Sequence, residues 1–356
     1  MFPFLFFLFS LTLPDADFII ILSAYRRLIM SSVPYSRYIV GSVPWYSFLI
    51  VTGIVIAIFL AVRGERKAGL PKDTVIDLAL WILPLGIIGA RLYYVIFSWD
   101  QFKDDLLSVF RIWEGGIAIY GGIIAGMAVL ILFCRKRHLP PLLLCDIIAP
   151  GLVLAQSLGR WGNWFNIEAY GRAVTRPELC FFPFALQVPQ DAYTWHYATF
   201  FYESAWNLLI FIFLISVGKK ICSRQGDTFF FYVFLYAAGR LVIEELRLDS
   251  LFASSSVRIS QLLSVLLCIS VFLRYFCSFL KLRRPSPLVY FLFLPLFLSA
   301  SFPALLYSLS GSFLKSWPGA RIILFLSLCS LIMIICIFAV HHTLTKAEAC
   351  NADNKA

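Results

Sequence analysis

The stretch that decides the fold is "LLLCDIIAPGLVLAQSLGRWGNWFN", residues 142–166, an apolar run that ends on arginine, asparagine and two tryptophans. A helix needs about 20 apolar residues to cross the ~30 Å hydrocarbon layer of a membrane, and residues 142–159 come close to that length. Unpaired backbone groups are costly in lipid, so a run of this kind is predicted to be helical. The stretch therefore indicates a membrane-spanning helix with a polar end.

The composition of the whole chain points the same way. The 356 residues are 60% hydrophobic and only 14% charged, whereas soluble domains are about a quarter charged. The net charge of +10 falls in short loops between apolar runs, which indicates membrane topology rather than nucleic-acid binding. Nine cysteines without a CxxC pair and four histidines without HExxH predict no disulfide framework and no metal site. We expect an all-α integral membrane protein that needs no cofactor and binds no nucleic acid.

Nine apolar runs are predicted to span the membrane. They are residues 46–63, 74–98, 115–134, 142–159, 199–217, 228–246, 259–280, 288–308 and 320–340. Lys/Arg clusters follow the first, third, fifth and seventh runs, so every second loop is basic. By the positive-inside rule these loops are cytoplasmic. The long segment at residues 160–198 is then expected to form a small extracytoplasmic head.

That head begins with "GRWGNWFNIEAYGR", residues 159–172. Arg160 and Asn163 offer donors of different geometry, and arginine binds phosphate through two parallel hydrogen bonds. The glycines allow close backbone approach. The stretch therefore favours an anionic phosphate as ligand. Composition alone also allows an arginine that reaches out to the lipid headgroups beside a belt of aromatics, and Trp161 and Trp164 are expected to be interfacial.

A second polar group lies in "FLYAAGRLVIEELRLD", residues 234–249. Tyr236, Arg240, Glu244 and Arg247 follow spacings of four, four and three, which predicts one face of a helix. Ionisable residues inside a span cost roughly 2.5 to 3.5 kcal/mol each unless they are paired or face a polar cavity. We interpret this face as functional. The alternative is an Arg240/Glu244 pair that only stiffens the bundle.

Three further positions near the outer side are candidates for the functional site. Tyr120 lies in "WEGGIAIYGGIIAG", residues 113–126, where its hydroxyl could reach a cavity, while Gly122 and Gly126 are expected to serve helix packing. Arg91 in "GARLYYV" adds a buried cation on the side of Arg160. Glu203 at the start of the fifth run could hold an arginine in place, although a plain helix start explains it equally well.

These motifs together resemble the prolipoprotein diacylglyceryl transferases of bacteria. The similarity extends from about Trp45 to about Arg284 and includes "VPWYSFLIVTG", "CDIIAP", "FFYES" and "GRLVIEELR" in order, besides the stretches quoted above. The resemblance implies a transferase that moves the diacylglyceryl group of phosphatidylglycerol to the lipobox cysteine of a prolipoprotein. Glycerol phosphate would be released at the extracytoplasmic side of the bacterial plasma membrane.

The resemblance also implies roles for single residues. Arg160 and Arg240 are implied to be catalytic. The positions implied or expected to bind substrate are Arg160, Asn163, Glu168, Gly171, Arg91, Tyr46, Tyr236 and Arg247. Many family members have a histidine at the position of Tyr120, proposed as the base that takes the thiol proton, and tyrosine with its ordinary pKa of ~10 is a poor base. The base is therefore left open between Tyr120 and Glu244.

The family pattern ends near residue 284, which suggests four parts. We expect an N-terminal extension at 1–40, a seven-span transferase membrane domain at 41–284, an additional two-helix membrane hairpin at 285–345, and a disordered polar tail at 346–356. Arg26 and Arg27 fit the topology poorly, so a true start at Met30 is a further hypothesis. The alternative function is a catalytically altered phospholipid-binding or transporter-like membrane protein.

Overall fold

The computed structural model describes residues 36–218, 221–222, 224–250, 257–282, 287–310 and 319–353. Most of the expected N-terminal extension, including Met30, lies outside the described residues. The last helix continues through Asp353, so the expectation of a disordered tail from residue 346 is wrong over residues 346–353.

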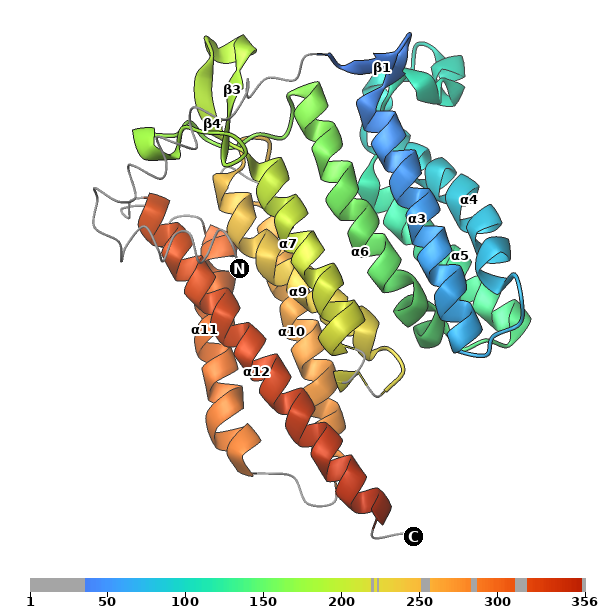
Figure 1. Ribbon diagram of the computed structural model, residues 1–356, viewed down its shortest axis with the longest axis vertical. Coiled ribbons are helices and arrows are strands. Elements are labelled where there is room, and N and C mark those ends of the chain that lie inside the picture. The colour runs from blue at the N-terminus through green and yellow to red at the C-terminus, as the bar shows by residue number, and fades with distance from the viewer. Residues whose placement is uncertain are drawn as a thin grey trace. The chain divides into compact units, whose positions relative to one another are not determined.

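The described elements are almost all helical (Figure 1). In chain order they are β1 Tyr38–Val40, β2 Val43–Pro44, α3 Trp45–Lys67, α4 Thr74–Phe97, the 3-10 turns η1 Trp99–Gln101, η2 Leu106–Phe110 and η3 Ile112–Glu114, α5 Ile119–Arg137, α6 Pro141–Asn166, η4 Pro177–Leu179, β3 Ala185–Val188, η5 Pro189–Asp191, β4 Thr194–Tyr197, α7 Thr199–Phe213, the π-helical η6 Leu214–Gly218, α9 Asp227–Ile243, η7 Glu244–Leu246, α10 Ile259–Leu280, the π-helical η8 Val289–Phe293, α11 Leu294–Ser310 and α12 Gly319–Asp353. Eight helices in the described part of the chain are long and apolar enough to cross a membrane. The 17-residue α9 falls just short and continues into η7. The prediction of a multi-pass, all-α membrane protein is confirmed.

Two helix boundaries differ from the predicted runs in a way that shapes the site. Helix α5 begins at Ile119 rather than at residue 115, because Gly115 and Gly116 adopt φ of 92° and 74°, outside the helical region. Helix α6 extends to Asn166 rather than ending at residue 159. The polar end of the opening stretch is therefore helical, and Arg160 projects from a rigid element.

The chain divides into two compact units, and the larger comprises Met1–Ile54 and Leu152–Ala356. Within it α9 packs against α7, α10 and α12, and α11 and α12 run side by side (Figure 1). Lipid is as apolar as these helices, so packing and hydrogen bonds hold them together. The indole of Trp206 occupies the space beside Gly239 and donates to Leu235 O at 2.8 Å. A side chain at residue 239 would force α7 and α9 apart.

The expected head, residues 160–198, is helical as far as Asn166. Its remainder, residues 167–198, which we call the head segment, belongs to the same unit. Strands β3 and β4 pair antiparallel, with Val188 opposite Thr194. Leu186, Val188, Ala198 and Phe200 form a buried cluster, against which Trp161 and Trp164 pack. The two tryptophans therefore help form the core of the head segment instead of being only interfacial, because both contact Phe182 and Trp161 also contacts Phe200 and Phe201 at the start of α7.

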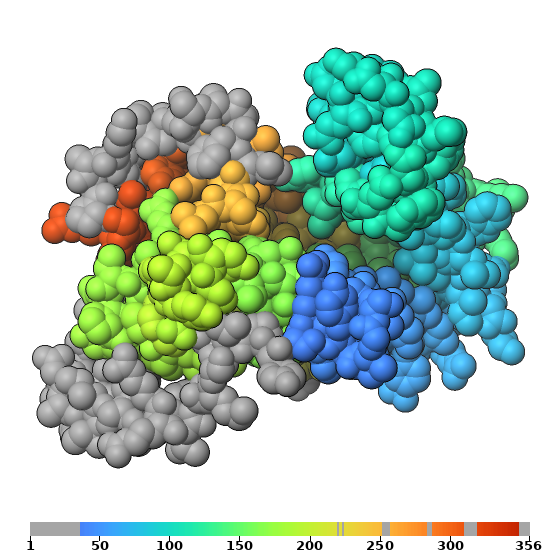
Figure 2. Space-filling view, turned by 90° about the horizontal axis from the view of Figure 1, so that it is seen from above, coloured from blue at the N-terminus to red at the C-terminus, as the bar shows by residue number. Residues whose placement is uncertain are grey.

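The smaller unit is Val55–Gly151. Helices α4 and α5 approach closely at other glycines than the two expected: a Cβ added at Gly121 would lie 2.4 Å from Gly89 O. At Gly122 and Gly126 an added Cβ would meet its nearest neighbour at 3.6 and 3.5 Å, an ordinary contact, so their expected role in packing stays a prediction. The loop at residues 98–118, which contains η1, η2 and η3, forms a compact mass of its own, shown in teal in Figure 2.

Candidate active site

The site is built around Glu203, a buried carboxylate near the start of α7. Arg160 reaches it from α6, with its Nε 2.6 Å from Glu203 Oε2. Arg160 also interacts with the hydroxyl of Tyr236 on α9. Arg160 and Tyr236, two predicted residues that are distant in sequence, thus lie together, and Arg160 binds a carboxylate that the sequence did not clearly distinguish from a helix start.

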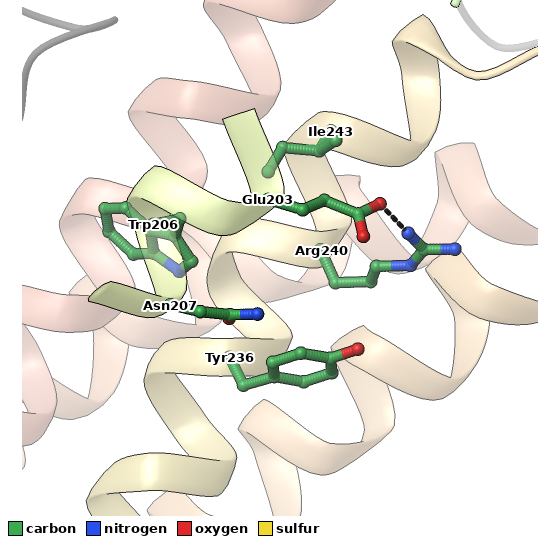
Figure 3. Close-up of a pocket in the computed structure, with 6 residues that line it drawn as sticks. All are labelled: Glu203, Trp206, Asn207, Tyr236, Arg240 and Ile243. Atoms are coloured by element: carbon green, nitrogen blue, oxygen red, sulfur yellow. Dashed lines mark hydrogen bonds and ion pairs between the residues drawn. The ribbon is translucent and has the colours of Figure 1, made fainter. Parts of the chain in front are cut away.

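Two more guanidinium groups bind the same carboxylate. Arg240 pairs with Glu203 Oε1 (Figure 3), and Arg247 Nη1 lies 2.8 Å from that atom. Arg240 also holds Glu244, with 2.7 Å between Nη2 and Oε2. We call Arg160, Arg240 and Arg247 the arginine cluster.

Three carboxylates pair with the three guanidinium groups of the arginine cluster, and one of them is open to solvent. Glu203 and Glu244 are buried, with side chains 5% and 1% exposed. Asp249 is half-exposed and holds Arg247 through both carboxylate oxygens, at 2.9 and 2.5 Å. Burial works against the charge on Arg247, but the carboxylates of Glu203 and Asp249 raise its pKa above the ordinary arginine value. Because Asp249 is open to solvent, an anionic ligand can compete with it for the donors of Arg247.

The prediction of one helix face holds for Tyr236 and Arg240 and is wrong for Arg247. Helix α9 ends at Ile243, η7 makes a tight 3-10 turn, and Arg247 is extended with φ −76° and ψ 144°. Arg247 still reaches Glu203, because its backbone forms a β-bridge with Gly171. A Cβ on Gly171 would lie 2.7 Å from Leu246 O, so only glycine permits this approach.

The chain leaves α6 through an unusual backbone. Ile167 and Ala169 adopt positive φ of 53° and 54°, which is uncommon for residues with side chains and strained for a β-branched one. Glu168 lies exposed between them, and Asn166 donates to its Oε1 at 3.0 Å. Arg37 in turn donates to Asn166 Oδ1 at 2.9 Å. The turn fixes where Glu168 is placed after the helix.

Tyr46 on α3 joins this edge of the site. It lies against Gly162, where an added Cβ would be 2.6 Å from its ring, and it interacts electrostatically with Glu168 and Arg160. The backbone carbonyl oxygen of Asn163 accepts a hydrogen bond from the backbone N–H of Glu168 at 3.0 Å. The predicted binding residues of α3 and α6 therefore lie near Arg160.

A small cavity lies between α7 and α9 (Figure 3). It is lined by Glu203, Trp206, Asn207, Tyr236, Arg240 and Ile243 and holds about 10 Å³, roughly the room of one water molecule. Asn207 is buried, and its Nδ2 has no hydrogen-bond partner among the described residues. We did not predict Asn207 from the sequence. The available signal was its spacing of four from Glu203 in an apolar helix, which puts both polar groups on one face.

Arg91 and Tyr120 belong to the smaller unit, and Arg91 has partners of another kind. Its guanidinium donates to the backbone carbonyls of the 98–118 loop, at 2.9 Å to Val109, 2.8 Å to Gly116 and 2.6 Å to Ser108. These contacts assign Arg91 to holding the loop, and its predicted binding role gains no support from them. Tyr120 is half-buried in the first turn of α5.

The chain is similar to known proteins over most of its length. Residues 36–277 match the family model described as prolipoprotein diacylglyceryl transferase. Three relatives carry the name phosphatidylglycerol-prolipoprotein diacylglyceryl transferase. The protein of Lactobacillus gasseri is 43% identical over 63% of this chain and 82% of its own. That of Enterococcus faecalis is 44% identical over 64% and 83%, and that of Streptococcus mutans is 46% identical over 63% and 86%.

Proposed function

We infer that this chain, which belongs to the prolipoprotein diacylglyceryl transferase family, transfers the diacylglyceryl group of phosphatidylglycerol to the lipobox cysteine of prolipoproteins. The observation that carries the residue assignment is the convergence of Arg160, Arg240 and Arg247 on Glu203. All four residues lie in the segment that matches the family. The relatives' transferase names favour an enzyme over a phospholipid-binding or transporter-like protein.

The proposed reaction is a displacement at carbon. The cysteine thiolate forms a C–S bond to the terminal carbon of the diacylglyceryl group, and the C–O bond from that carbon to the phosphate breaks. The phosphate oxygen keeps the bonding electrons and leaves as glycerol phosphate, while the thiol proton passes to a base or to water. The products are a thioether and a phosphate monoester, and no metal or cofactor enters the balance.

The arginine cluster suits the leaving group of this reaction. Guanidinium groups bind phosphate through two parallel N–H donors, and donors fixed in advance stabilise charge that develops in the transition state. We propose that Arg160 and Arg240 hold the phosphate and that Arg247 adds to the field. Glu203 keeps the three guanidinium groups oriented. The remaining positions proposed to line the substrate are Tyr46, Asn163, Glu168, Gly171 and Tyr236.

The base has two candidates, Tyr120 and Glu244. Glu244 is buried, and its carboxylate is paired with Arg240. A thiol with an ordinary pKa near ~8.5 needs little help beside three guanidinium groups. We propose that the guanidinium groups of the arginine cluster favour the thiolate mainly by lowering the pKa of the substrate thiol.

We propose that the site faces the extracytoplasmic side of the bacterial plasma membrane. The basic residues cluster in every second loop, which the positive-inside rule assigns to the cytoplasm. The C-terminal end of α6, which carries Arg160, leads into the head segment, and the head segment and Arg247 belong to the opposite set of connections. Prolipoproteins carry their lipobox cysteine in the signal peptide, which would meet the enzyme at that surface.

The test is complementation of a strain that lacks the transferase, followed by mass spectrometry of one reporter lipoprotein. The wild-type chain should restore the thioether-linked diacylglyceryl mass, and Arg160→Ala should not. Arg137→Ala is the matched control, because Arg137 pairs with Asp77 on an exposed surface. Absence of the lipid mass with the wild-type chain would contradict the proposed reaction, and near-normal lipidation by Arg160→Ala would contradict the role of Arg160.

A further inference from the structure

Helices α11 and α12 lie beyond residues 36–277, the part of the chain that matches the family, yet both are bonded to the helices of the site. Tyr307 of α11 donates to Glu245 Oε2 at 2.8 Å. Ser330 of α12 donates to the carbonyl of Ala238 at 3.1 Å, on the helix that carries Arg240. These contacts are buried. The two helices therefore have polar links to α9 and η7 in addition to apolar packing.

Glu245 is the point where the first of these links enters the core. It is 2% exposed and holds Arg172, with 2.8 Å between Nη2 and Oε1, as well as Arg258. The hydroxyl of Tyr307 also donates to this carboxylate, and the side-chain amide of Gln261 donates to it more weakly, at 3.5 Å. A Cβ on Gly319, the first residue of α12, would lie 3.7 Å from Arg172 Nη1. Both helices of the hairpin thus adjoin the Glu245 network.

The turn η7 joins this network to the arginine cluster. Its first residue, Glu244, binds Arg240, its second residue is Glu245, and the residue after the turn is Arg247, which binds Glu203. The 3-10 turn has poorer hydrogen-bond geometry than an α-helix, so its position depends on the side-chain contacts that hold it. Adjacent carboxylates in one short turn face two different networks.

We propose that Tyr307 is a positioning residue for the transferase site, which acts through Glu245 to fix η7 and hence the partners of Arg240 and Glu203. This inference rests on the proposed function. Without the phenolic hydroxyl, Glu245 keeps two cationic partners but loses the donor that orients its Oε2 toward α11. Small displacements of positioned catalytic groups slow a reaction markedly. The extra hairpin then contributes to turnover as well as to anchoring in the membrane.

The test is Tyr307→Phe in the full-length chain, which removes one hydroxyl and keeps the ring. We expect kcat to fall by roughly three- to tenfold, less than the full loss of a hydrogen bond to a charged group would give, because Tyr307 acts on the site indirectly, with KM changed less than twofold. Tyr290→Phe is the matched control: Tyr290 lies in the same hairpin as Tyr307, and its ring packs on Phe276 and Phe279 of α10, with centroid distances of 5.9 and 5.6 Å. A kcat within twofold of that control overturns the inference, as does a loss explained by less folded protein.

A double variant tests the route through Glu245. If Tyr307 acts through this carboxylate, Tyr307→Phe should lower kcat no further in a Glu245→Gln background. Independent, multiplying effects would overturn the inference. An inactive wild-type chain would refute the proposed function itself, whereas an active wild type with an unaffected Tyr307→Phe variant refutes only the role of Tyr307.

Discussion

Arg91 is buried and Arg240 is partly buried, both on apolar helices, and their partners differ in kind. Arg91 donates to backbone carbonyls of one loop and lies over the ring of Phe102, 5.0 Å from its centroid. Arg240 binds the carboxylates of Glu203 and Glu244, and Glu203 is shared with two more arginines. Several backbone carbonyls can accept hydrogen bonds from one arginine, which then holds their loop in place. A shared carboxylate brings several guanidinium groups together in fixed orientations, which suits the binding of a phosphate.

The largest expected effect comes from removing Arg240. Arg240→Ala should lower kcat/KM by at least a thousandfold, about 4 kcal/mol of transition-state stabilisation, because the leaving phosphate loses a fixed bidentate donor. The measurement is transfer of labelled diacylglyceryl from phosphatidylglycerol to a lipobox peptide in membranes. Arg240→Lys keeps the charge but not the planar fork, and should recover only part of the activity. Activity of Arg240→Ala above a tenth of wild type would place Arg240 with Arg91 as a structural arginine.

The next effect comes from the carboxylate that the arginine cluster shares. Glu203→Gln should lower kcat by about 30- to 100-fold, because three guanidinium groups lose their common anchor, and should destabilise the fold by roughly 3 kcal/mol. Asp249→Asn is the control: Asp249 binds Arg247 from a half-exposed position, and an exposed ion pair contributes little. Its kcat should stay within about threefold of wild type. Equal losses in the two variants would show that burial of Glu203 has no special role.

The opposite pattern is expected at Arg91. Arg91→Lys should lower the free energy of unfolding by about 2 to 3 kcal/mol, since an ammonium group cannot serve all the carbonyls that the guanidinium fork reaches. Activity per folded molecule should stay within about threefold. Thermal unfolding in detergent and transfer assays on the same samples measure both quantities. A variant with unchanged unfolding and at least tenfold lower activity would assign Arg91 to the substrate, as the sequence had suggested.

The sequence predicted the helices and the main cations but not most of their partners. Runs of apolar residues are sufficient to predict spans, and an arginine in a span is conspicuous because its burial is costly. The partner of Arg160 lies 43 residues later, at Glu203, and nothing local distinguishes that carboxylate from a helix start. The departure of Arg247 from α9 depends on a bridge to Gly171. Contacts between segments distant in sequence therefore decide which polar residues form the site.

The smallest expected effect concerns the base. Tyr120→Phe should lower kcat by less than tenfold, because the guanidinium groups of the arginine cluster favour the thiolate and lower the thiol pKa below its ordinary ~8.5. The thiolate fraction grows with pH, so the rate should rise through that lowered pKa in wild type and variant alike, with the same inflection. A hundredfold loss, together with disappearance of the rising limb, would instead make Tyr120 the proton acceptor. The arginine cluster would then stabilise the leaving group alone.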